Sequence, residues 1–342
     1  MAHIVVVGTG GTIASRSDQK CDGKVAVDTI QTLIDPVKSS RLPPGVTITA
    51  KDAGLMNSYN LTLGNIRHIG EFVRLILKAH DVDGVVVTHG TDTLEEVAFF
   101  CDLISDDPRP VVFTGAQRSI DTLGSDESGN IADAIAVAAA PSSRGRGVLV
   151  AFGGEVFAAR GLRKVDTFNA QPFAPVVGGP IGLVHDRFVH YFTRPEEWHR
   201  VPMVDEKFDS RRIATVINQP GLSDGDSNVV AAVARGIDGL IILGTGAGNT
   251  SKSMLGGIKA AMTVGIPVLL SSRLPFGYIT PTYGNGGAID AVALGAVPVW
   301  SVPFTQARLL LATLLNRDKR EQVVADLAHF DGRGGRWSPS RL

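Results

Sequence analysis

Short runs of consecutive hydrophobic residues alternate along the chain with segments of helical periodicity. The runs are three to five residues long and rich in valine and isoleucine, which is typical of buried strands: residues 4–7, 85–87, 111–114, 148–152, 213–217, 240–243 and 268–271. Hydrophobic residues three or four positions apart predict helices between them: residues 62–79, 94–104, 131–140, 229–234, 254–264 and 305–315. Repeated strand–helix units predict an α/β fold of parallel sheets with helices on both faces.

The composition of the chain changes between residues 193 and 212. This stretch holds charged residues, prolines and a tryptophan without hydrophobic periodicity, as expected for a linker. We therefore expect a larger N-terminal catalytic α/β domain over residues 1–192 and a smaller C-terminal α/β domain over residues 213–342. A tail rich in Gly, Arg and Ser, from about residue 331, is expected to be mobile.

The overall composition excludes several classes of protein. The chain has 342 residues, 44% hydrophobic and 20% charged, with a net charge of −1, which is ordinary for a soluble globular protein and gives no basic field for nucleic acid. Its two cysteines, Cys21 and Cys101, cannot form a disulfide framework or a four-cysteine metal site. The sequence shows no signal peptide and no run long enough to span a membrane, so we expect a cytoplasmic protein without membrane partners.

A glycine-rich turn, GTGGT, follows the first predicted strand at residues 8–12. Two interpretations compete here. A dinucleotide fingerprint would need glycine at position 13, where the chain has Ile13. Alternatively, Thr12 stands at the carboxyl end of a buried strand, where open α/β sheets place their chemistry, and acts as a nucleophile. A plain helix-capping role for Thr12 is also open. A second near-match, GAGNTSKS at residues 246–253, has Ser251 where a phosphate-binding loop needs glycine.

Thr91 and Asp92 follow another buried strand in the same way. Local patterning alone favours capping, because Thr93 and Glu96 fit a capping box. However, adjacent parallel strands would bring the two threonines into one crevice. A threonine hydroxyl needs a base, and a lysine positioned by a carboxylate can serve. Backbone N–H groups near Gly11 and Thr91 could then stabilise an oxyanion during acyl transfer. Periodicity does not say which lysine takes part.

Two segments resemble the signatures of the bacterial-type L-asparaginases: TGGTIA at residues 9–14 and THGTDTLEE at residues 88–96. The resemblance continues in both halves of the chain, at residues 113–118, 160–164, 179–182 and 271–275. It implies hydrolysis of a carboxamide with Thr12 as nucleophile and a relay of Thr91, Lys164 and Asp92. It also implies a homo-oligomer, a tetramer or dimer with sites between subunits, and no metal or cofactor.

The resemblance further implies a set of substrate-binding positions: Gly11, Gly90, Ala53, Gly54 and Ala116. Here the chain departs from the family, because Ala53 and Gly54 stand where the family has polar groups. Ala247 replaces an asparagine that the neighbouring subunit often supplies, residues 15–26 lack the usual tyrosine, and no acid occurs between Arg273 and Asp290. L-Asparagine is the first expected substrate. An amide without a free α-amino acid head, and a non-catalytic small-molecule binding protein, are the alternatives. The nearest polar replacements for the missing groups are Asn57, Ser58, Asn249 and Arg273.

Overall fold

The computed structural model describes residues 1–18, 23–38, 42–196, 200–221, 228–317, 322–323 and 325–327, with the backbone but not the side chains of Thr12, Ser17, Asp18 and residues 23–26. The chain forms two compact units, Met1–Met203 and Val204–Leu342. The boundary falls within the segment where the composition changes. The tail expected from residue 331 and Cys21 lie outside the described residues.

The first unit is built on an eight-stranded sheet in the order β12-β11-β8-β7-β6-β5-β1-β4. Five strands are parallel, namely β4, β1, β5, β6 and β7, and the hydrophobic runs predict all of them except β4. The remaining three are antiparallel and were not predicted. The bounds are β1 Ala2–Gly10, β4 Val46–Met56, β5 Gly84–Thr88, β6 Val111–Thr114, β7 Val148–Phe152, β8 Glu155–Ala158, β11 Gly182–His185 and β12 Phe188–Tyr191.

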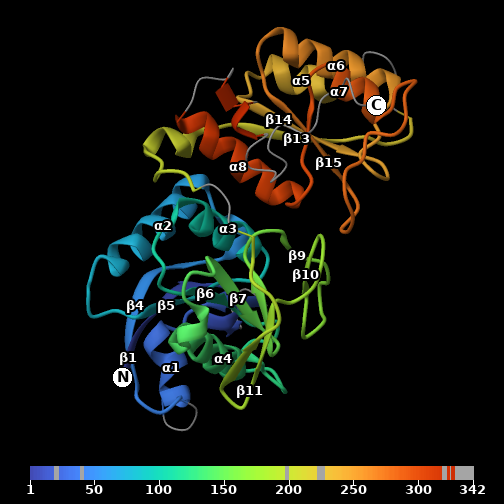
Figure 1. Cartoon of the computed structure of the whole chain (residues 1–342). Helices are drawn as coiled ribbons and strands as arrows, with labels where there is room; N and C mark the ends of the chain where they lie inside the picture. The colour runs from blue at the N-terminus through green and yellow to red at the C-terminus, as the bar shows by residue number, and fades with distance from the viewer. Residues whose placement is uncertain are drawn as a thin grey trace. The chain divides into compact units, whose positions relative to one another are not determined.

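Four α-helices cover this sheet, two on each face (Figure 1). Helices α1 and α4 pack on one face, where their buried residues join those of β1, β5, β6 and β7 in one hydrophobic cluster. Helices α2 and α3 cover the other face. The bounds are α1 Ile30–Lys38, α2 Leu63–Leu77, α3 Leu94–Ile104 and α4 Glu127–Ala139, with short 3₁₀ turns at Thr12–Ala14, Ser58–Asn60 and Pro141–Ser143. Because both faces are covered, the central strands are buried throughout, which explains their continuous hydrophobic runs.

Two antiparallel strand pairs stand outside the main sheet. Strands β2 (Ser15–Asp18) and β3 (Gly23–Ala26) pair in a polar stretch that has no hydrophobic periodicity. Arg16 Nε donates to Asp28 Oδ2 at 2.7 Å and ties β2 to the start of α1. Strands β9 (Leu162–Lys164) and β10 (Phe173–Pro175) form the second pair.

The second unit contains a smaller, four-stranded parallel sheet in the order β13-β14-β15-β16. Helices α5, α6 and α7 contribute to one hydrophobic cluster with its strands, and α8 lies on the opposite face (Figure 1). The bounds are β13 Ile213–Ile217, β14 Gly239–Gly244, β15 Val268–Ser272, β16 Val297–Pro298, α5 Asn228–Ala234, α6 Lys252–Thr263, α7 Ala288–Ala293 and α8 Phe304–Arg317, with a 3₁₀ turn at Glu206–Ser210. Both units are thus α/β, the N-terminal one larger.

Candidate functional site

The strand order of the first unit reverses between β1 and β5. The chain leaves β1 for β4 on one side and returns to β5 on the other. Ligands of open α/β sheets bind beside such a reversal, at the carboxyl ends of the strands. The turns after these two strands carry Thr12 and Thr91. The sequence therefore places both threonines where the topology favours a site.

The two turns pack directly on each other through glycine. A Cβ atom on Gly11 would lie 2.3 Å from the Cα atom of Gly90, and Gly11 has a positive φ of 85°. A Cβ atom on Gly90 would lie 2.4 Å from Ser58 Oγ. Only glycine permits this approach, which brings the Thr12 and Thr91 backbones close together.

Thr12 begins the 3₁₀ turn after Gly11. Gly11 O accepts hydrogen bonds from Ala14 N at 3.0 Å and from Ser15 Oγ at 2.8 Å, which hold this turn. The Gly11 N–H donates to Met56 O at 3.0 Å. This N–H is therefore already bonded within the fold and does not face a ligand.

Thr91, Asp92 and Lys164 meet at the end of β5. Lys164 Nζ lies 2.8 Å from Thr91 Oγ1 and 2.8 Å from Asp92 Oδ1. Thr91 is buried, the Lys164 side chain is 17% exposed, and the Asp92 side chain is 55% exposed. The lysine thus bridges a buried hydroxyl and a carboxylate that remains open to solvent.

Two further residues position this group, and periodicity gave no signal for either. The buried Glu95 side chain, in the first turn of α3, accepts the backbone N–H of Lys164 and so fixes the end of β9. Gln117 Oε1 accepts the hydroxyl proton of Thr91 at 3.0 Å. Gln117 does lie in the turn after the strand at residues 111–114, within a segment that the resemblance includes.

The capping box expected at Thr93 and Glu96 is wrong. Thr93 precedes α3, but its hydroxyl makes no capping bond and instead donates to Ser58 O at 3.0 Å. Thr93 therefore holds the Ser58–Asn60 turn beside Gly90. The neighbouring His89 is fully buried, its Nδ1 lies 2.8 Å from Gly90 O, and burial lowers its pKa to about 4. It is neutral at physiological pH, and its Nδ1–H donates to that carbonyl.

The predicted substrate-binding positions differ in their surroundings. Ala53 and Gly54 lie in a bulge of β4 beside the β1 turn. Gly8 pairs with Asp52 and Gly10 pairs with Met56, so β4 has two more residues than β1 between these two pairs. Ala53 is half-buried and Gly54 is exposed with a φ of 130°. Bulges of this kind redirect residues next to active sites. Ala116 is fully buried in the hydrophobic cluster, so its side chain packs in the core.

Ala247 belongs to the second unit. It lies in the turn after β14, where its carbonyl accepts the N–H of Thr280 at 3.1 Å. The turn is closed by paired backbone contacts between Thr245 and Asn249. An alanine here offers a ligand no polar side chain.

A hydroxyl, an amine and a carboxylate linked in this way can transfer protons to and from a reacting group. Family models show to which enzyme family the chain belongs. The model of the asparaginase N-terminal domain matches residues 3–197, and that of the glutaminase/asparaginase C-terminal domain matches residues 221–327. The chain belongs to the asparaginase family. It is an enzyme that hydrolyses amides.

The chain aligns with similar proteins over nearly its whole length. It is 36% identical over 324 residues to the probable L-asparaginase of Deinococcus radiodurans, covering 92% of this chain and 94% of the relative. It is 31% identical over 336 residues to a probable periplasmic L-asparaginase of Haemophilus influenzae, covering 95% and 91%. The crystal structure of a probable cytoplasmic L-asparaginase from Campylobacter jejuni matches it with a TM-score of 0.84 at 25% identity, covering 96% and 100%.

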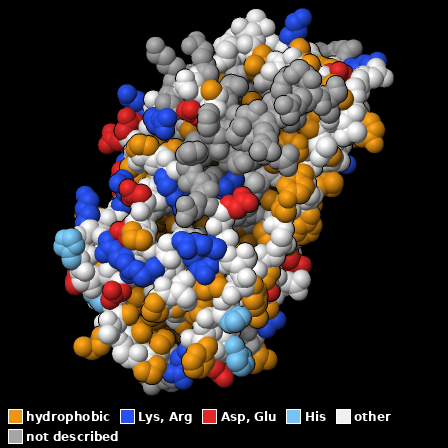
Figure 2. Space-filling model, in the orientation of Figure 1, with side chains coloured by type: hydrophobic (Ala, Val, Ile, Leu, Met, Phe, Trp, Pro, Cys, Tyr) orange, Lys and Arg blue, Asp and Glu red, His pale blue; other side chains and the backbone are white. Residues whose placement is uncertain are grey.

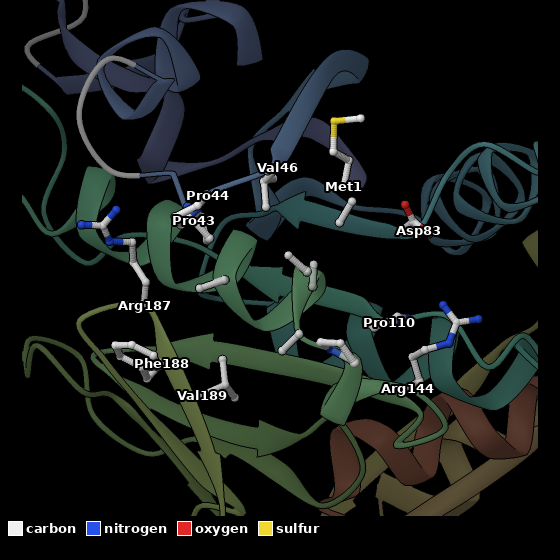
Figure 3. A pocket seen from close by; sticks show the side chains of 17 residues that line it. Met1, Pro43, Pro44, Val46, Asp83, Pro110, Arg144, Arg187, Phe188 and Val189 are labelled. Atoms are coloured by element: carbon white, nitrogen blue, oxygen red, sulfur yellow. The ribbon is translucent and has the colours of Figure 1, made fainter.

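A cavity of about 560 Å³ lies at the opposite, amino-terminal edge of the same sheet (Figure 3). Prolines and alanines line much of it, with Arg144 and Arg187 at its two ends. It contains none of the candidate site residues.

Within the described ranges, no group of three His, Cys, Asp or Glu side chains is placed to hold a metal ion, and no helix is long and hydrophobic enough to cross a membrane.

Proposed function

We propose that this enzyme hydrolyses the side-chain amide of L-asparagine to L-aspartate and ammonia through an acyl-threonine intermediate. The hydroxyl oxygen of Thr12 attacks the amide carbon, a C–O bond forms, and the C–N bond breaks as ammonia leaves. Water then attacks the ester and releases aspartate. The observation that carries this proposal is the bridge of Lys164 between Thr91 and Asp92, beside the turn that begins at Gly11.

Each polar group has a distinct task in this scheme. The relay of Thr91 and Lys164 takes the proton of the attacking hydroxyl and passes a proton to the leaving amine, while Asp92 stabilises the positive charge of the lysine. The backbone N–H of Thr91 is the proposed oxyanion donor, because that of Gly11 is bound to Met56 O.

Variants at the relay test this assignment. Thr12→Ala should fold and lose nearly all ammonia release. Lys164→Met and Asp92→Ala should lower kcat by roughly 10²–10⁴, the usual contribution of general acid–base catalysis, with smaller changes in KM. Lys78→Met, at the solvent-exposed end of α2, is the matched control and should keep full activity. An unchanged kcat in Lys164→Met would remove the relay from the mechanism.

Assays with a panel of amides test the proposed substrate. Ammonia release from L-asparagine should exceed that from L-glutamine and from amides without the α-amino or α-carboxyl group. Since Ala53 and Gly54 offer no polar side chain, other groups have to bind the amino acid head. Ser58, which packs against Gly90, is the nearest of the expected replacements. Faster turnover of the amides that lack the α-amino or α-carboxyl group would contradict asparagine as the substrate.

The assembly and location of the enzyme are part of the proposal. Four large hydrophobic side chains are about half exposed on one loop of the second unit: Leu274, Phe276, Tyr278 and Tyr283. Figure 2 shows hydrophobic side chains gathered at the surface of this unit. Such patches favour association, so we expect a homo-oligomer, which light scattering would measure. The similar Campylobacter jejuni protein is a probable cytoplasmic L-asparaginase, and we expect the same location here, which cell fractionation would test.

A further inference from the structure

The cavity at the amino-terminal edge of the first sheet has rigid, hydrophobic walls (Figure 3). Alanines at the end of α4 contribute to them, together with Pro43, Pro44, Pro110 and Pro141. Neither an alanine nor a proline side chain can swing into the space, so the cavity is open without any rearrangement. Its volume of about 560 Å³ lies within the range of small-molecule sites, roughly 300–1,000 Å³.

Arg144 stands at one end of this cavity. Its backbone N–H donates to Pro141 O at 3.2 Å, so the 3₁₀ turn after α4 fixes where the side chain begins. Within the described part of the chain, its guanidinium makes no hydrogen bond and no ion pair. The nearby carboxylate of Asp107 is already bonded to Arg109, and Arg144 only helps to lower its pKa. The donors of Arg144 are therefore available to a ligand.

Arg187 stands at the other end, in the two-residue turn between β11 and β12. The turn has a φ of 47° at Asp186 and of 71° at Arg187. Turns with a positive φ at both central residues favour glycine at the second one. An arginine there costs conformational energy, which indicates a role for its side chain. Arg187 Nη1 donates to Leu42 O at 3.0 Å, which orients the guanidinium and leaves Nη2 and Nε without a partner among the residues described.

We propose that this cavity binds an elongated dianion with a hydrophobic middle, such as a long-chain dicarboxylate. One carboxylate pairs with Arg144 and the other with Arg187, because the planar guanidinium matches a carboxylate. The methylene chain between them displaces water from the alanines and prolines. Among the described side chains that line the cavity, Asp83 is the one acid, and its Oδ2 accepts the backbone N–H of His3 at 2.9 Å. The charge of the lining therefore favours an anion.

Calorimetric titration of the full chain with suberate tests the inference. Suberate should bind more tightly than octanoate, which has one carboxylate, and than malonate, which is too short to contact both arginines. Arg144→Met and Arg187→Met should each weaken suberate binding by about tenfold, the lower end for a charged hydrogen bond, because both side chains are exposed. Arg74→Met is the matched control, since it removes the same charge from α2, on the other face of the sheet, and should leave the affinity unchanged.

Two further variants separate this site from the catalytic one and from a structural role of the turn. Lys164→Met should bind suberate like the unmodified protein, and weaker binding would place the diacid in the catalytic site and overturn the inference. Arg187→Gly suits the turn, so it should keep the melting temperature and still bind about tenfold more weakly.

Three other results would refute the inference. The first is that suberate does not bind, or binds no more tightly than malonate. The second is an unchanged affinity in both Arg144→Met and Arg187→Met, because the arginines would then have no part in binding. The third is an affinity that falls as the protein concentration rises, which would show that a second copy of the chain covers the cavity.

Discussion

Glu127 lies at the start of α4 with an unsatisfied carboxyl group. The residue is fully buried, and within the described part of the chain neither side-chain oxygen has a hydrogen-bond partner. Its pKa is raised to about 7, chiefly by burial and also by the carboxylates of Asp28 and Asp126, while Arg16 partly opposes the shift. We predict that Glu127→Gln makes the protein more stable, and only above about pH 5.

The magnitude follows from the two pKa values. In the unfolded chain Glu127 loses its proton near the ordinary value of 4.5, whereas in the folded chain it keeps it to about pH 7. Between these values the folded state binds one proton more, so stability falls as the pH rises through this window and stays lost above it. The difference corresponds to about 3 kcal/mol, at about 1.4 kcal/mol for each pKa unit. The amide of glutamine does not ionise, so the variant avoids this loss.

Melting temperatures of both proteins between pH 4.5 and 8 test the reasoning. The curves should coincide at pH 4.5 and differ by roughly 6–12 °C at pH 8, as expected for about 3 kcal/mol in a unit of this size. Buried His89, whose pKa is lowered to about 4, gives an opposite slope below pH 6.5, but both proteins share it and it cancels in the difference. Glu196→Gln, at an exposed position, is the control for the chemical change. A difference that does not vary with pH would refute the assignment.

Two further predictions concern the structural basis of the first unit. Gly11→Ala should abolish activity and destabilise the fold far more than Gly178→Ala. Both positions have a φ near +85°, but only at Gly11 would the new methyl group meet the backbone of Gly90. Equal melting temperatures of the two variants would argue against the close packing of the turns. Asp102→Ala should lower the free energy of unfolding, measured in urea, by roughly 2 kcal/mol. Asp102 is buried, pairs with Arg200 at 2.6 Å and accepts a backbone N–H of β7. An unchanged urea midpoint would contradict this role.

The fold could be predicted where strands are buried on both faces. The runs at residues 85–87 and 148–152 correspond to β5 and β7, because such strands have to be hydrophobic at every position. Strands β11 and β12 were missed because they are four residues long and have only alternate residues buried. The second half of β4 was missed because its bulge interrupts the alternation of the strand.

The site was only partly predictable for a related reason. The two threonines follow strand ends that the hydrophobic pattern marks by itself. Lys164 is 73 positions from Thr91, and only the resemblance selected it. Glu95 and Gln117 bond backbone groups whose positions depend on the tertiary fold, so no local pattern identifies them. The same holds for Thr93, whose hydroxyl bonds Ser58 O, 35 positions away, instead of capping its own helix.

The proposed function assigns reaction chemistry and substrate recognition to different residues. Thr91, Asp92, Lys164 and Gln117 all belong to the first unit, and every hydrogen bond that orders them is formed within it. Ala53 and Gly54 lie in the bulge of β4 in the same unit, and Ala247 lies in the second unit. Under the proposed function, substitutions at these three positions should alter which amide is bound, whereas substitutions around Thr91 should alter proton transfer. Loss of activity toward one amide, with turnover of another retained, would therefore identify a change in recognition rather than in the relay.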